Sequence, residues 1–194
     1  MWAEGRTAEI ALKTRFAALA LAAALPFADL PAMADTPATA PAAPTIYTPT
    51  DMYGYLTMAL SAGEFTRQAA QVALRRSHSE PVKAYAQAML HAESESRQAL
   101  LDESHRSGLH PDAPVLTGSL ERRLEGLMTA PDASFDAAYL AAEADVQRLS
   151  LAAHRTYAAQ GDNAILRAVA ASLAPRVTDG LAQTEALQAP PPAG

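Results

Sequence analysis

The chain has 194 residues, of which 49% are hydrophobic and 6% aromatic, and it contains no cysteine. This length and apolar content suit one domain with a substantial core and are too small for two ordinary domains. Abundant alanine and few aromatic residues favour closely packed helices over a sheet, so we expect an all-α protein. The net charge of -6, without any basic tract, argues against nucleic acid or an anionic membrane surface as the partner. The lack of cysteine excludes disulfides, thiolate metal sites and cysteine nucleophiles.

Residues 1–34 have the pattern of a cleaved signal peptide. Three basic residues precede an apolar run over residues 16–25, and Ala32-Met33-Ala34 forms a small-x-small cleavage site. The apolar run is shorter than the roughly 20 residues that span a bilayer. We therefore expect cleavage after Ala34, a periplasmic or secreted mature protein, and no integral membrane span. Residues 35–50 and 189–194 are rich in proline and are predicted to be a linker and a tail around a helical domain at 51–188.

Within 51–188 the apolar spacing predicts four long amphipathic helices. Capping residues and glycines place them at about 51–76, 79–107, 132–160 and 163–188, with Pro175 inside the last. The links at Ser77–Ser79 and at Gly161 are short, so the helices that they join are expected to run antiparallel. The link from Ser107 to Pro131 is long enough to return along the bundle and to contain a short helix over 116–128. This predicts a ferritin-like four-helix bundle with a long crossover between the second and third long helices.

The inward faces follow from the spacing of apolar residues. On the second long helix, Glu93 falls within an otherwise apolar stripe and is expected to face inward. The third long helix has two adjacent stripes. We expect the apolar stripe to be buried and the polar stripe to face water. The apolar stripe consists of Phe135, Tyr139, Ala142, Val146, Leu149 and Ala153. The polar stripe consists of Asp136, Leu140, Glu143, Gln147, Ser150 and His154.

Four stretches also support a family resemblance. They are residues 73–77 (ALRRS), 81–89 (PVKAYAQAM) and 135–140 (FDAAYL), and Leu173 with Pro175. In this order and spacing they resemble the bacterial family catalogued as domain of unknown function 4142. The resemblance implies an exported protein with a ferritin-like bundle, of a family sometimes described as predicted outer membrane proteins.

This chain departs from the family at the positions that could hold a metal. The resemblance implies histidines at the positions of Glu93, Gln147 and Gly180, and commonly a glutamate at the position of Thr66. Only Glu93 is a competent metal ligand among these four, and the chain has no Glu-x-x-His pair of the kind that di-iron bundles use.

Glu93, Glu143 and His154 are therefore weak metal candidates. The interpretation that we favour for Glu93 is a buried carboxylate that pairs with Arg67 or Arg176, or reaches a water-lined edge. We expect His154 to be capped or exposed at an edge, and the remaining histidines to be solvated. A pairing of Glu143 with Gln147 is equally compatible with an exposed hydrogen bond.

These observations predict a non-enzymatic, exported protein without metal or cofactor, which acts through its surface as an envelope interaction or stress-associated protein. Its partner is expected to be an envelope protein or a small molecule. Two alternatives stay open: a metal-binding or di-iron redox protein with a degraded or altered site, and a carrier of an apolar small molecule.

We expect the mature chain to begin at Asp35, because signal peptidase accepts the small residues Ala32 and Ala34. The mature form should be released by osmotic shock, and intact-mass measurement gives its first residue. A chain found in the membrane pellet with residues 1–34 still attached would contradict this prediction.

Overall fold

The computed structural model describes residues 48–116 and 118–189. These residues form five α-helices and one short 3-10 helix, and the described part contains no strand, so the all-α prediction is confirmed. The elements are α1 (Met52–Arg76), α2 (Glu80–Arg106), α3 (Gly118–Thr129), η1 (Asp132–Ser134), α4 (Phe135–Gln160) and α5 (Ala164–Gln188). The predicted signal peptide, residues 35–47 of the predicted linker and residues 190–194 of the tail lie outside the described residues. No described helix has the length and hydropathy needed to cross a bilayer.

The helices begin and end at the residues that the sequence singles out. The Asp51 carboxylate accepts the amide of Gly54 at 2.8 Å, and the Asn163 side chain accepts the amide of Leu166 at 3.1 Å. Both side chains satisfy amides that have no partner within their own helix. Gly108, with φ of 74°, takes the left-handed conformation that ends α2. One boundary differs from the prediction, because Asp132–Ser134 forms the 3-10 helix η1 and α4 begins only at Phe135.

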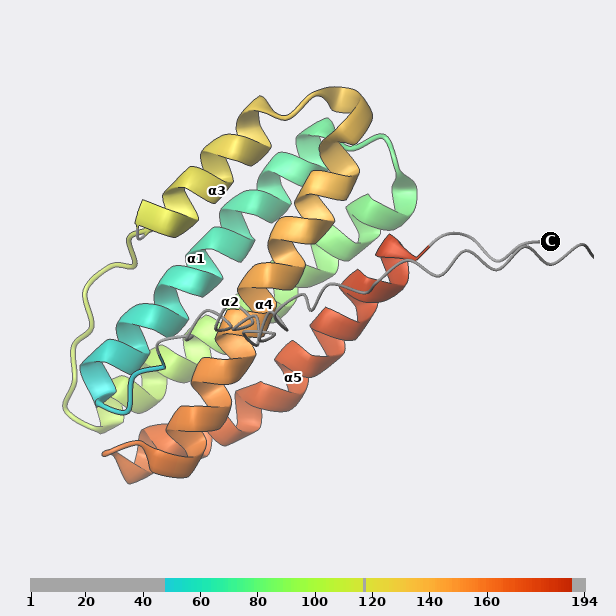
Figure 1. Cartoon of the computed structure of the whole chain (residues 1–194). Helices are drawn as coiled ribbons and strands as arrows, with labels where there is room; N and C mark the ends of the chain where they lie inside the picture. The colour runs from blue at the N-terminus through green and yellow to red at the C-terminus, as the bar shows by residue number, and fades with distance from the viewer. Residues whose placement is uncertain (1–47, 117, 190–194) are drawn as a thin grey trace, which may run out of the picture. The chain divides into compact units, whose positions relative to one another are not determined.

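Each long helix packs against two others. α1 packs against α2 and α4, and α5 packs against α4 and α2, while α3 lies along the outer side of α1 (Figure 1). At one end of the bundle the Tyr55 ring of α1 stacks on the Tyr157 ring of α4. At the other end Arg76, the last residue of α1, contacts the end of α3 and the residues before α4. These contacts show that α4 runs antiparallel to α1.

The apolar core consists of two clusters rather than one. One contains Phe65, Tyr85, Leu124 and Tyr139 among others, and the second contains residues such as Tyr55, Leu100, Tyr157 and Leu173. On α2, Glu93 falls between Ala86 of the first cluster and Leu100 of the second. Polar side chains are thus placed where the two clusters meet.

The expectation that the polar stripe of α4 faces water is wrong. Glu143, Gln147 and His154 are all buried, whereas Leu149 of the apolar stripe is only half-buried. The reason is that α4 packs against α1 and α5 and also touches α3, so that its neighbours cover an arc wider than one stripe. Ala142 of the apolar stripe is also only half-buried, and its remaining residues are buried as predicted, namely Phe135, Tyr139, Val146 and Ala153.

Arg76 holds the connection between α3 and α4 against the end of α1. Its guanidinium donates to the carbonyl oxygens of Leu127 and Ala130, at 2.8 and 2.5 Å, and to the Asp132 carboxylate at 2.6 Å. It also lies 4.6 Å from the centre of the Phe135 ring. One side chain therefore satisfies carbonyl groups at a helix end and fixes the start of α4.

Replacing Arg76 by alanine should reduce the free energy of unfolding by about 2–3 kcal/mol, because it removes several charge-assisted hydrogen bonds and a cation–π contact. Arg75→Ala is the matched control, since Arg75 is the exposed neighbour on the same turn. Urea unfolding followed by circular dichroism measures both. Equal losses in the two variants would show that Arg76 does not hold this connection.

Candidate functional site

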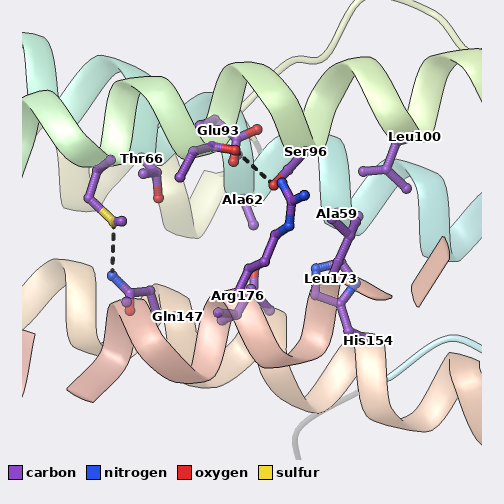
Figure 2. A pocket seen from close by; sticks show the side chains of 16 residues that line it. Ala59, Ala62, Thr66, Glu93, Ser96, Leu100, Gln147, His154, Leu173 and Arg176 are labelled. Atoms are coloured by element: carbon purple, nitrogen blue, oxygen red, sulfur yellow. Dashed lines mark hydrogen bonds between the residues drawn. The ribbon is translucent and has the colours of Figure 1, made fainter. Parts of the chain in front are cut away.

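A cavity of about 70 Å³ lies at the middle of the bundle and is lined by α1, α2, α4 and α5 (Figure 2). Its walls are mostly small or aliphatic side chains, with a minority of polar ones: Thr66, Glu93, Ser96, Gln147, Ser150, His154 and Arg176. The cavity wall includes all four positions that the family resemblance singles out, namely Thr66, Glu93, Gln147 and Gly180. The structure therefore brings together residues that are far apart in the sequence.

The Glu93 carboxyl group lies against the backbone of α1 at Gly63. A Cβ atom at residue 63 would be 1.8 Å from Glu93 Oε1, so this position of the carboxyl group requires glycine. Glu93 is largely buried and makes no hydrogen bond or ion pair with any described residue. Burial, followed by the charge of Glu143, raises the pKa of Glu93 to about 8.

The predicted partners of Glu93 are wrong. Arg67 pairs instead with Glu64, its neighbour one turn away, and Arg176 donates to Glu95 at 3.0 Å. The Glu93 carboxyl group is held on the inner side of α2 against Gly63, and neither arginine pairs with it. The inward orientation predicted for Glu93 is confirmed, but without the compensating charge.

Glu143 is completely buried on α4. The Thr66 hydroxyl of α1 donates to Glu143 Oε2 at 3.2 Å, whereas Oε1 has no hydrogen-bond partner among the described residues. Burial raises the pKa of the Glu143 carboxyl to about 7, although the neighbouring polar side chains of Thr66 and Gln147 oppose this shift. Near neutral pH, Glu143 and Glu93 are therefore both partly protonated.

Gln147 forms a second polar group with residues of α2 and α5. Its amide nitrogen donates to the Tyr85 hydroxyl at 2.5 Å and to the Thr184 hydroxyl at 3.3 Å, and lies 3.6 Å from the Met89 sulfur. Gln147 Oε1 has no partner in the described part of the chain. It lies 3.2 Å from the point where a Cβ of residue 180 would be, so Gly180 leaves it room. Gln147 thus forms no exposed pair with Glu143.

His154 is buried, so the expectation of a capped or edge-exposed side chain is wrong. Its Nδ1 lies 2.9 Å from the Tyr55 hydroxyl, and burial lowers its pKa to about 4. The imidazole is therefore neutral at neutral pH and engaged with α1. The other four histidines, at 78, 91, 105 and 110, are exposed as expected.

These residues do not fit a ferritin-type di-iron centre. Such a centre takes carboxylates and histidines from all four helices. Across residues 48–116 and 118–189, no group of three or more acidic or histidine side chains is placed to hold a metal ion. Gln147 and Gly180 offer no carboxylate or imidazole, and one nitrogen of His154 is bound to Tyr55.

Gly63 was not predicted as a residue of the site, although its position as a glycine inside a helix could have indicated it. Gly63, like Gly180, is a glycine in the interior of a predicted helix, where it costs roughly 1 kcal/mol relative to alanine. A glycine retained at such a position indicates that another group approaches the backbone closely. Here that group is the Glu93 carboxyl.

Comparisons with known proteins agree with the helical architecture. The sequence model of the family described as Domain of unknown function (DUF4142) matches residues 36–187. No curated protein matches the chain. Among solved structures, the chain resembles the crystal structure of a DUF305 fragment from Deinococcus radiodurans, with a TM-score of 0.62 and 15% identity. The match covers 70% of this chain and 93% of that chain, and at this identity it shows the fold alone.

Glu143→Gln should make stability less dependent on pH. A raised pKa means that ionisation of Glu143 is costly in the folded state, whereas the unfolded chain ionises near the ordinary value of 4.5. The wild type should therefore lose stability as pH rises from 4.5 towards 7, by at most about 1.4 kcal/mol per pH unit from this group. The variant lacks this loss, so its free energy of unfolding relative to the wild type should increase over the same range.

Denaturant unfolding at several pH values measures this difference, with Glu125→Gln, at an exposed carboxylate, as the control. A constant difference between Glu143→Gln and the wild type from pH 4.5 to 8 would contradict the burial of an ionisable Glu143.

Proposed function

The chain belongs to the family described as Domain of unknown function (DUF4142), and we propose that this member is an exported, non-enzymatic bundle that binds a partner in the cell envelope. The observation that carries the proposal is the chemistry of the central cavity. At the positions where the family resemblance implies metal-binding side chains, the cavity presents Thr66, Gln147 and Gly180 beside a single carboxyl group, that of Glu93. These groups suit binding rather than redox or nucleophilic catalysis.

A ferritin-like arrangement with a crossover is part of this proposal. It is supported by the contacts of Arg76, which lies at the end of α1 just before α2 begins and also binds residues directly before α4. Because α2 and α4 then start at the same end of the bundle, the segment with α3 returns the chain along its length. The α3 helix covers the outer side of α1 as a crossover helix would.

Export and the envelope location rest on the leader sequence. Its basic residues, its short apolar run and the small residues Ala32 and Ala34 support cleavage and release from the membrane. An envelope protein fits an interaction or stress-associated role that needs no cofactor, and its partner is an envelope protein or a small molecule.

The second candidate function is a metal-binding or redox protein with an altered site. One observation favours it: Glu143 Oε1 is buried without a partner, and the Glu93 carboxyl group is close enough for Glu143 to raise its pKa. Two neighbouring carboxyl groups with few hydrogen bonds are what an altered metal site would retain. Against it, no group of three or more acidic or histidine side chains in the described residues is placed to hold a metal ion.

Removal of metal should leave the melting temperature unchanged. A metal bound only to the native state would stabilise it by about 2.7 kcal/mol at a hundredfold excess over the dissociation constant, which is readily measured. The experiment compares thermal unfolding with and without EDTA, and adds elemental analysis of protein purified from the periplasm without an affinity-tag metal.

A melting temperature that falls with EDTA and recovers with iron, manganese or zinc would favour the metal protein instead. Glu93→Leu is the control for the site, because it should abolish such a response only if the metal binds in the cavity.

A further inference from the structure

The Glu93 carboxyl group lies between two spaces. On one side is the central cavity, and on the other is a groove of about 400 Å³ that is lined by α1, α2 and residues Ala113 and Pro114 of the segment between α2 and α3. Two residues, Gly63 and Glu93, line both the cavity and the groove. Gly63 has no side chain, and the Glu93 carboxyl group fills the place that its Cβ atom would take. This carboxyl group therefore separates the cavity from the groove at α1.

Glu93 has an alternative partner on its own helix. In its inward position it makes no hydrogen bond or ion pair with a described residue. Arg97 follows four residues later, and a glutamate four residues before an arginine is the favourable order for an ion pair on a helix surface. Within the described residues, Arg97 lies 3.6 Å from Glu64 but makes no hydrogen bond with it. Two positions are thus available to Glu93: inward against Gly63, and outward beside Arg97.

Charges on the two sides favour the outward position once Glu93 is ionised. After burial, the fully buried Glu143 is the second cause that raises the pKa of Glu93, to about 8. In the groove, Arg97 lowers this pKa more than Glu64 raises it. Glu64 also accepts hydrogen bonds from Arg67, so two guanidinium groups face one carboxylate there. An ionised Glu93 is therefore repelled from the interior and attracted to the groove.

The other charged or titratable groups near Glu93 do not compete with this attraction. On α5, Arg176 lines the cavity but donates to Glu95 at 3.0 Å (Figure 2). On α4, His154 is neutral at neutral pH and is hydrogen-bonded to α1. The segment between α2 and α3 contributes two uncharged residues to the groove. Arg97 is thus the cation best placed to receive Glu93.

We propose that Glu93 is a pH-operated gate between the groove and the central cavity: the neutral carboxyl group lies against Gly63 and closes the passage, and the ionised carboxylate turns outward to Arg97 and opens it. The open gate connects the cavity with the groove, through which a small-molecule partner enters. As control of a binding cavity, this inference rests on the proposed function. The movement of Glu93 is measured without any partner, so the gate and the proposed function can fail separately.

Crystal structures of the mature full-length protein at about pH 6 and about pH 10, two units on either side of the pKa of about 8, show the position of Glu93 directly. At the lower pH the carboxyl group should lie against Gly63, and at the higher pH it should lie within hydrogen-bond distance of Arg97. The same position of Glu93 in both structures would overturn the proposal.

Carbon-13 NMR follows the same change in solution. The Glu93 carboxyl carbon and the Arg97 guanidinium carbon should titrate with one common midpoint, at or below pH 8, because pairing with Arg97 stabilises the ionised form. Arg97→Gln removes this partner and should raise the Glu93 midpoint by at least about 0.2 pH unit, the value of an (i, i+4) ion pair. Arg106→Gln, at an exposed arginine of the same helix, is the matched control and should leave the midpoint unchanged. Equal midpoints in Arg97→Gln and the wild type would contradict an outward pairing.

Two further variants fix the gate in one position. Gly63→Ala should hold Glu93 outward even at about pH 6, because the new Cβ atom would lie 1.8 Å from Glu93 Oε1. Glu93→Gln cannot ionise and should keep its side chain inward at both pH values. Circular dichroism confirms the folding of each variant. An inward Glu93 in folded Gly63→Ala, or a glutamine that turns outward at the higher pH, would exclude a gate operated by the charge of Glu93.

Discussion

Burial of the Glu143 carboxyl group at the middle of the bundle is the constraint on which the rest of the site depends. The group is fully enclosed, and the Thr66 hydroxyl donates a hydrogen bond to it. Burial is the main cause of the raised pKa values of Glu93, Tyr85 and Tyr139, and the charge of Glu143 is the second cause for each. On α4 it lies between Leu140 and Val146, which both belong to the first apolar cluster. Burying a carboxyl group with so few partners lowers the stability of the folded state. We therefore infer that Glu143 has a functional role and does not merely fill space in the core.

Two glycines give the cavity its shape. Gly63 lets the Glu93 carboxyl group lie on the backbone of α1, and Gly180 leaves space for the Gln147 amide beside α5. In both places a side chain of the facing helix occupies the room that a methyl group would take. The result is a small cavity with the oxygen acceptors of Glu93 and Gln147 on its wall, whose chemistry differs from that of a nitrogen-rich metal site.

This chemistry connects the site with the proposed role. A small cavity between two apolar clusters, with a minority of polar side chains on its wall, suits binding of a small partner, and contacts at both ends hold the helices around it. At one end Tyr55 stacks on Tyr157 and meets His154, and at the other Arg76 joins α1 to the connection that follows α3. A binding site between two such ends is pre-organised, which lowers the entropic cost of holding a ligand. The similarity to the DUF305 fragment supports the fold but carries no information on the ligand.

The sequence by itself determined the all-α class, the ends of the helices and the inward position of Glu93. These features depend on local physics: Asp51 and Asn163 cap their own helices, Gly108 takes a positive φ, and the stripe on α2 follows from the helical period. The tertiary structure alone decided that the polar stripe of α4 is buried, that Arg67 and Arg176 pair elsewhere, and that His154 binds Tyr55. Each of these depends on which distant segment lies opposite, for example α1 opposite His154. The helical period of the sequence does not determine which segment lies opposite. The helices that pack around α4 decide how much of its surface is buried, and the nearest carboxylate decides which partner an arginine takes.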